Sequence, residues 1–68
     1  MFKVHRDLYI DIDNVGLVEI RNPHKVDKEF YCQVNFFDKR GELIRDVDLP
    51  YGDDGDYIIE FAKRLEAA

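Results

Sequence analysis

Residues 29–49, EFYCQVNFFDKRGELIRDVDL, are the stretch that decides the fold. Side chains alternate between apolar and mixed over 29–37, which is the two-residue period of a β-strand. The turn sequence Asp38-Lys39-Arg40-Gly41 follows, in which Asp suits the first turn position and Gly adopts the positive φ that closes the turn. Residues 42–49 then alternate again. The sequence therefore predicts an antiparallel hairpin of two strands.

The alternation assigns the side chains of this hairpin to two faces. In the first strand, one face carries Phe30, Cys32, Val34 and Phe36, and the other carries Tyr31, Gln33, Asn35 and Phe37. In the second strand, one face carries Leu43, Val47 and Leu49, and the other carries Ile44, Asp46 and Asp48. The face that carries Phe36 is the more apolar, so we expect the rest of the chain to cover it.

Two further strands are predicted upstream of this hairpin. Residues 8–13 alternate, and the pair Asp13-Asn14 then offers a turn, because both side chains bond to nearby backbone. Residues 15–21 alternate again, up to the pair Asn22-Pro23, where proline supplies no backbone donor. The polar residues 22–28 are expected to form an exposed loop.

A helix is predicted downstream, after Leu49-Pro50-Tyr51-Gly52 breaks the last strand. Three acidic residues crowd its start, where a carboxylate can cap backbone N–H groups: Asp53, Asp54 and Asp56. An apolar stripe follows at helical spacing: Ile58, Phe61, Ala62 and Leu65. Taken together, the sequence predicts an α+β fold: a four-stranded antiparallel β-meander with one C-terminal α-helix packed on one face.

Composition and charge limit the function. With 68 residues and 46% hydrophobic side chains, the chain is expected to be one folded domain over 1–68. The net charge of −5 argues against nucleic acid as a direct ligand, because phosphate binding needs clustered Lys and Arg. The single cysteine, Cys32, cannot form an intramolecular disulfide, and no apolar run reaches the roughly 20 residues of a membrane span. We therefore expect a cytoplasmic protein that binds no membrane.

Two acidic segments are candidate cation sites. Asp11, Asp13 and Gly16 match the first, third and sixth positions of an EF-hand loop, but Val15 and Asn22 stand where further oxygen ligands are needed. The acidic residues at the helix start could also gather a cation, although helix capping explains them without one. A cation-binding domain is the weakest of three functional hypotheses, and no bound metal or other cofactor is expected.

No catalytic motif is present, and we expect the protein not to be an enzyme. The chain has no Ser or Thr, which removes the usual hydroxyl nucleophiles. His5, His24 and Cys32 lack the paired spacing of a zinc site. Cys32 falls on the apolar face of its strand, where a free cysteine usually acts as a small buried hydrophobe.

The uncovered face of the sheet is the main candidate site. It is predicted to mix aromatic and acidic side chains, which fits a basic protein partner, because Tyr is favoured at interfaces and complementary charge steers association. The residues expected to contact that partner are Tyr9, Asp11, Asp13, Tyr31, Phe37, Asp46, Asp48, Asp53, Asp54 and Asp56. Leu17 and Ile44 are expected to add apolar area to this face. The alternative hypothesis is a small structural or regulatory homodimer that uses the same face.

The chain as a whole resembles short bacterial and phage proteins that open with a strand of the type seen in Tyr9-Ile10-Asp11-Ile12-Asp13-Asn14-Val15, continue as a meander and close with a helix. Its small size, its acidity and its lack of a catalytic motif are also similar to phage-encoded inhibitors of host defence, such as anti-CRISPR proteins. Many of those occupy basic nucleic-acid-binding surfaces with carboxylates in place of phosphates. The resemblance implies an inhibitor of nucleic-acid-handling machinery as one form of the expected function, and it assigns no role to individual residues.

Overall fold

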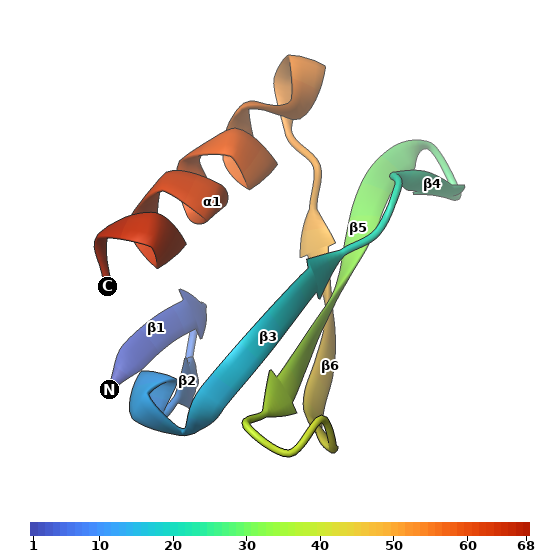
Figure 1. Ribbon diagram of the computed structural model, residues 1–68. Helices are drawn as coiled ribbons and strands as arrows, with labels where there is room; N and C mark the ends of the chain where they lie inside the picture. The colour runs from blue at the N-terminus through green and yellow to red at the C-terminus, as the bar shows by residue number, and fades with distance from the viewer.

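Six strands in two antiparallel sheets and one C-terminal helix make up the structure, a computed structural model that describes residues 1–68 (Figure 1). The elements in chain order are β1 (Phe2–His5), β2 (Leu8–Ile10), a 3₁₀ turn (Ile12–Asn14), β3 (Val15–Ile20), β4 (His24–Val26), β5 (Glu29–Asp38), β6 (Leu43–Pro50), a second 3₁₀ turn (Asp53–Gly55) and α1 (Asp56–Ala67). The α+β class, the antiparallel pairing and the C-terminal helix are confirmed. The prediction of a single four-stranded meander is wrong.

The main sheet is built around β5. Strand β6 pairs along one edge of β5, and both β3 and β4 pair along the other. Ile20 lies opposite Val34 and His24 lies opposite Tyr31, so β3 and β4 have one more residue between these positions than β5 has. The interruption includes Pro23, which has no N–H to donate to a neighbouring strand. In effect, β3 and β4 form one edge strand with a break at residues 21–23.

The segment 22–28 is exposed as predicted, but it is not a loop throughout. Residues His24–Val26 form β4, and the turn at Asp27 and Lys28 joins it to β5. Asp27 has a φ of 58°, which Asp tolerates and which tight hairpins require. The side chains of β4 are all exposed, so no apolar pattern marks this strand in the sequence.

The prediction for residues 8–13 is also wrong, both in where the strand ends and in which strand it pairs with. Only Leu8–Ile10 is extended, and it pairs with β1 in a separate two-stranded sheet. The chain then turns because the Asp11 carboxylate accepts hydrogen bonds from the Asp13 backbone N–H (3.2 Å) and from Asn14 Nδ2 (3.1 Å). This side-chain cap starts the 3₁₀ turn that leads into β3.

The hairpin between β5 and β6 is confirmed. The Asp38 carboxylate accepts hydrogen bonds from the N–H groups of Arg40 (2.9 Å) and Glu42 (3.0 Å), and Gly41 has a φ of 86°. These backbone hydrogen bonds, led by that of Glu42, hold the pKa of Asp38 below its ordinary value of 3.8. The turn therefore depends on an ionised Asp38.

The faces predicted for β6 need one correction. Phe36 lies opposite Arg45 but Phe37 lies opposite Leu43, so Ile44 is the extra residue of a β-bulge. A one-residue shift moves side chains to the opposite face. Leu43 therefore shares a face with Phe37, whereas Ile44 lies beside Ile10 of β2.

The helix stripe is confirmed, but the predicted carboxylate cap is wrong. Phe61 is buried, and the remaining stripe residues are partly buried: Ile58, Ala62 and Leu65. The residue before the helix is Gly55, which has a φ of 80° and makes no side-chain cap. A Cβ at this position would lie 2.8 Å from the Tyr51 ring, so glycine allows this close approach.

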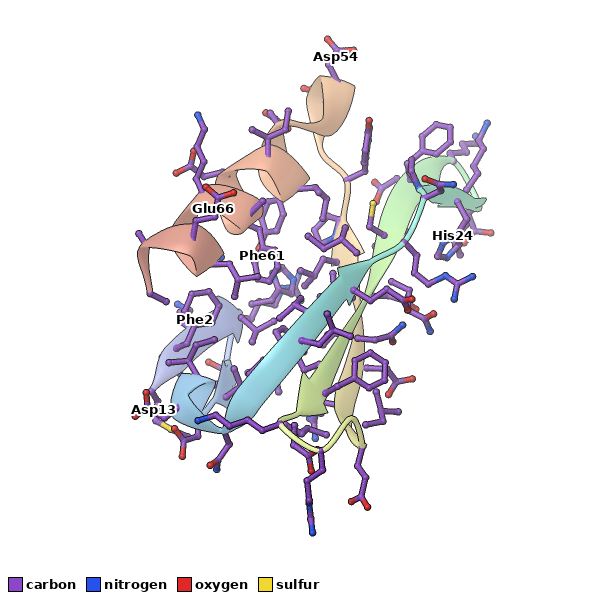
Figure 2. All side chains as sticks on the ribbon, in the orientation of Figure 1. Phe2, Asp13, His24, Asp54, Phe61 and Glu66 are labelled. Carbon is purple, nitrogen blue, oxygen red and sulfur yellow. The ribbon has the colours of Figure 1, made fainter.

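One side of the main sheet carries the core. Helix α1 and the β1–β2 hairpin lie together against this side, here called the inner face (Figure 1). The buried apolar cluster consists of Val4, Ile10, Val34, Phe36, Leu49 and Phe61, and Cys32 is buried on the same face. Figure 2 shows Phe61 pointing from the helix into the space between the helix and the sheet. The prediction that the face of Phe36 is the covered one is confirmed, although Phe30 at its end stays 49% exposed.

Contacts from α1 attach the β1–β2 hairpin. The Arg64 guanidinium donates hydrogen bonds to the backbone carbonyls of Lys3 (2.7 Å) and Val4 (3.4 Å). It also lies 5.4 Å from the ring centroid of Phe2 and 5.5 Å from that of Phe61. A second contact joins β1 to α1, because His5 Nδ1 and the Tyr57 hydroxyl are hydrogen-bonded to each other. Burial, together with the charges of Arg6 and Lys3, lowers the pKa of His5 below its ordinary value of 6.5.

Candidate protein-binding surface

The candidate site is the outer face, defined as the side chains of β3 to β6 that point away from α1. No strand or helix covers this face, which lies on the far side of the main sheet from α1 and the hairpin (Figure 1). Its members follow from the strand registers: Leu17, Glu19, His24, Val26, Glu29, Tyr31, Gln33, Asn35, Phe37, Leu43, Asp46 and Asp48.

An apolar row crosses one end of the outer face. Leu17 of β3 and Leu43 of β6 flank Phe37 of β5, because both are its register partners. Leu17 is 60% exposed and Leu43 is 55% exposed, while Phe37 between them is half-buried. Three large apolar side chains side by side on a sheet form a surface that a partner can desolvate.

A polar row follows beside the apolar one. Asn35 is buried, with 9% of its area exposed, and its Nδ2 donates a 2.8 Å hydrogen bond to Glu19 Oε1. Glu19 also lies 3.7 Å from Arg21 Nη1. The buried amide of Asn35 is therefore satisfied, and the charge of Glu19 is partly balanced within the chain.

The carboxylates of Asp46 and Asp48 are unpaired on the other side of the face. They lie opposite Asn35 and Gln33 respectively, on the edge strand β6. The ion pairs of the molecule use other carboxylates, namely those of Glu19, Asp38 and Glu42. Asp46 thus lies in the row next to the apolar row and Asp48 one row further along, and both carboxylates are exposed and free to pair with cations from outside the chain.

A shallow hollow ends the outer face at the β4–β5 turn. Its lining residues are Val26, Asp27, Lys28, Glu29, Tyr31 and Asp48. The Tyr31 hydroxyl donates a 3.2 Å hydrogen bond to Glu29 Oε2, and this bond together with the negative charge of Glu29 raises the pKa of Tyr31 above 10.0. The hollow therefore offers an aromatic ring beside three carboxylates and one lysine.

Six of the ten residues proposed for partner contact lie elsewhere. Tyr9 belongs to β2, opposite Lys3, and is 51% exposed outside the main sheet. Asp11 and Asp13 lie at the first 3₁₀ turn, and Asp53, Asp54 and Asp56 lie at the start of α1. In Figure 2, Asp13 and Asp54 are at opposite ends of the molecule. Only Tyr31, Phe37, Asp46 and Asp48 share the outer face.

Leu43 is the outer-face residue that sequence reasoning missed. The alternation of 42–49 placed Leu43 with the core and Ile44 outside, and the bulge at Ile44 reverses both positions. The bulge lies directly after the Asp38–Gly41 turn, and neighbouring Leu and Ile residues give no signal for choosing between them. Leu17 was correctly placed on the exposed side of its strand.

The structure brings together no group of three or more His, Cys, Asp or Glu side chains that could hold a metal ion. The Asp11 carboxylate is engaged in the cap of its own turn. Cys32 is buried, and burial raises the pKa of its thiol above 9.0. Its sulfur is therefore held in the unreactive thiol form. Helix α1 has 12 residues, and no helix of the structure is long and apolar enough to span a membrane.

Comparison with protein families, curated proteins and solved structures finds no match to this chain. Function is therefore inferred from the outer face itself.

Proposed function

We propose that this protein is a non-enzymatic interaction module whose outer face docks on a basic protein surface. The observation that carries the proposal is that the unpaired carboxylates of Asp46 and Asp48 share the outer face with the apolar row of Leu17, Phe37 and Leu43. Apolar area supplies affinity when it is desolvated, and complementary charge supplies rate and orientation.

Several positive side chains of the protein make contacts within the chain, whereas the carboxylates of β6 on the outer face do not. Arg64 is occupied by the carbonyls of β1 and by two aromatic rings, and Lys25 lies over the Phe30 ring at 5.9 Å. Arg40 pairs with the carboxylates of its own turn. Several cations thus serve internal contacts, whereas the β6 carboxylates do not. A partner with Lys and Arg side chains supplies what this face lacks.

The partner class that fits best is a protein that handles nucleic acid. Such proteins hold phosphates with clustered Lys and Arg, and carboxylates on a small acidic protein can occupy the same positions. With a net charge of −5, the chain is itself unsuited to bind the nucleic acid. We propose that it acts as an inhibitor of that kind of machinery by covering its basic surface.

The same charges weigh against a homodimer formed by two outer faces. Stacking one outer face on another places more carboxylates than cations in one interface, which costs free energy. Positive charge near this face comes from His24, from Lys28 in the end hollow and from Arg21, which already lies beside Glu19. The face is thus better matched to a foreign basic partner than to itself.

A basic peptide tests the proposal. The probe is a fluorescein-labelled peptide of alternating Arg and Leu, and the readout is fluorescence anisotropy at low and high salt. We expect Asp46→Asn with Asp48→Asn to weaken binding about tenfold at low salt, because exposed pairs contribute up to about 1 kcal/mol each. Added salt should weaken the wild-type complex by screening.

The matched control is Asp53→Asn with Asp54→Asn, which removes the same net charge at the start of α1. We expect this variant to bind the peptide almost as tightly as the wild type. If both variants lose the same affinity, net charge alone governs binding and the outer face is not the site. Binding that is unchanged by the Asp46 and Asp48 substitutions also rejects the proposal.

A further inference from the structure

A cavity of about 410 Å³ lies between α1 and the first strand with its turn, away from the outer face. In Figure 1, β1 lies beside the C-terminal part of α1. Val4 and Phe61 belong to the apolar lining, and both are almost wholly buried. The polar lining residues of this cavity, here called the basic cavity, are Lys3, His5, Arg6, Tyr57, Glu60 and Arg64. Three of the ten Lys and Arg residues of an acidic protein thus border one cavity.

The positive side chains of the basic cavity have no carboxylate partners. All ion pairs of the molecule lie in the main sheet and its turns, so Lys3, Arg6 and Arg64 are unpaired. Glu60 adds one negative charge to these three positive charges, and the lining therefore carries a net charge of +2 when His5 is neutral. Because the chain as a whole has a net charge of −5, this local excess of positive charge stands out, and an anion from outside can balance it.

Arg6 is placed beside the basic cavity by an unusual backbone conformation. It lies in the two-residue turn between β1 and β2 and has a φ of 49°, which Gly, Asn and Asp adopt more readily than Arg. The other non-glycine residues with positive φ are both aspartates, Asp27 and Asp54. Folding of the turn therefore does not explain an arginine here, and residues held in such conformations cluster at binding sites. What arginine adds is a guanidinium fork that matches phosphate oxygens.

The basic cavity also has hydrogen-bond donors to spare. A neutral imidazole has one N–H and a phenol has one O–H, and the hydrogen bond between His5 Nδ1 and the Tyr57 hydroxyl uses one of these two protons. If the hydroxyl donates, the N–H of His5 Nε2 remains, and if the imidazole donates, the O–H of Tyr57 remains. The Arg64 guanidinium uses two of its five N–H groups on the carbonyls of β1, so three remain. An anion with several oxygens can accept from more than one of these donors.

We propose that the basic cavity binds the phosphate group of a small phosphate monoester. Such a group carries a charge of about −2 near neutral pH, which balances the net charge of +2, and its oxygens accept hydrogen bonds. The cavity volume falls within the roughly 300–1,000 Å³ of small-molecule sites, so a small organic group fits beside the phosphate. A nucleic acid fits less well, because it needs cations along a groove that follows its backbone. This site goes beyond the proposed function and does not rest on it.

NMR of the two histidine side chains during a phosphate titration tests the proposal. The probes are inorganic phosphate and phenyl phosphate at about pH 7.5, where both are mostly dianions, with ionic strength held constant by sodium chloride. We expect saturable shifts of the His5 imidazole signals and none for His24, which lies on the outer face. Phenyl phosphate should bind more tightly than inorganic phosphate. Burial and the charges of Arg6 and Lys3 lower the pKa of His5, and a bound phosphate should raise this pKa by balancing those charges.

Three variants locate the site. Arg6→Asn removes the guanidinium but keeps a residue that tolerates a positive φ, so the turn is preserved, and it should weaken phosphate binding at least about tenfold. The matched control, Arg40→Asn, removes the same charge from the turn between β5 and β6 and should leave the affinity unchanged. Glu60→Gln removes the one negative charge of the lining and should tighten binding about two- to fivefold.

Several results would overturn the proposal. One is the absence of a saturable shift of His5 with either probe, and another is a shift that sodium chloride alone reproduces. Equal losses of affinity in Arg6→Asn and Arg40→Asn would show that net charge governs binding. Binding of inorganic phosphate with exclusion of phenyl phosphate would overturn the assignment to an ester. None of these measurements involves the basic peptide, so failure of this site and failure of the outer face are distinguishable.

Discussion

The two faces of β5 differ sharply although they belong to one strand. On the inner face, Cys32, Val34 and Phe36 expose 1% or less of their area. On the outer face, Tyr31 and Phe37 remain partly exposed. The difference arises because α1 and the β1–β2 hairpin both pack on the same side. A strand in this position serves stability with one set of side chains and is free to serve binding with the other.

Only the inner face of the main sheet is covered within residues 1–68. A domain of this size has a small core, and its surface is large relative to its volume. The helix and the β1–β2 hairpin both pack on the inner face, and the apolar row of Leu17, Phe37 and Leu43 stays exposed or half-buried. Exposed apolar area of this kind adds little to folding stability, and exposed apolar patches often mark interaction sites.

The largest expected effect is a difference in unfolding free energy between substitutions at Phe36 on the inner face and at its neighbour Phe37 on the outer face. Phe36→Ala leaves a cavity in the core and should lower the free energy of unfolding by about 3–5 kcal/mol. Phe37→Ala removes a half-exposed ring and should cost about 1 kcal/mol. Urea unfolding followed by circular dichroism measures both. Similar losses for the two variants would show that the outer face is part of the folding core.

The second effect concerns the attachment of the hairpin to α1. Arg64→Met removes two hydrogen bonds to the β1 carbonyls but keeps an apolar side chain beside Phe2 and Phe61, so we expect a loss of about 1–3 kcal/mol. Lys63→Met, at the exposed neighbouring position, is the control and should change stability little. Thermal unfolding compares the two variants. An unchanged melting temperature for Arg64→Met would mean that the inner face holds the hairpin without this residue.

A smaller effect is expected from pH. The pKa of His5 is lowered in the folded state, so the unfolded chain binds more protons as the pH falls below 6.5. The contribution of His5 to the free energy of unfolding should therefore be fully present above pH 6.5. It should be lost as the pH falls toward the folded-state pKa of His5. Asp38 acts in a separate, more acidic pH range. Because its pKa is lowered in the folded state, its contribution to the free energy of unfolding is lost only as the pH falls below the ordinary pKa of 3.8.

The variant His5→Gln tests this assignment. It should flatten the dependence of unfolding free energy on pH just below 6.5 and leave the more acidic window unchanged. Urea unfolding at a series of pH values gives the slope directly. A slope that is identical in the variant and the wild type would place the responsible proton on another group.

Local interactions account for the parts of the fold that could be predicted from sequence. The hairpin at Asp38–Gly41 follows from a turn whose hydrogen bonds lie within five residues, and the helix follows from a stripe that repeats at helical spacing. The covered face was predictable because Cys32, Val34 and Phe36 alternate over several residues without interruption. In each case the signal and the interaction occupy the same short stretch of chain.

The missed features depend on contacts that are distant in sequence or invisible to hydrophobic patterns. Strand β1 is held by Arg64 and Tyr57, more than 50 positions away, and β4 consists of three exposed residues joined to β5 by backbone pairing. The bulge at Ile44 changed which residue completes the apolar row. For the candidate site, Tyr31, Phe37, Asp46 and Asp48 could be grouped from alternation alone, whereas the acidic turns could not be placed relative to the sheet.

Methyl NMR during titration with the Arg–Leu peptide tests the central claim most directly. Leu17 and Leu43 report on the outer face, while Ile58 and Leu65 report on the contact between α1 and the sheet. We predict that the methyl signals of Leu17 and Leu43 shift as the peptide is added and that those of Ile58 and Leu65 do not. Shifts confined to α1 and the residues around Asp53 and Asp54, with Leu17 and Leu43 unchanged, would contradict the account.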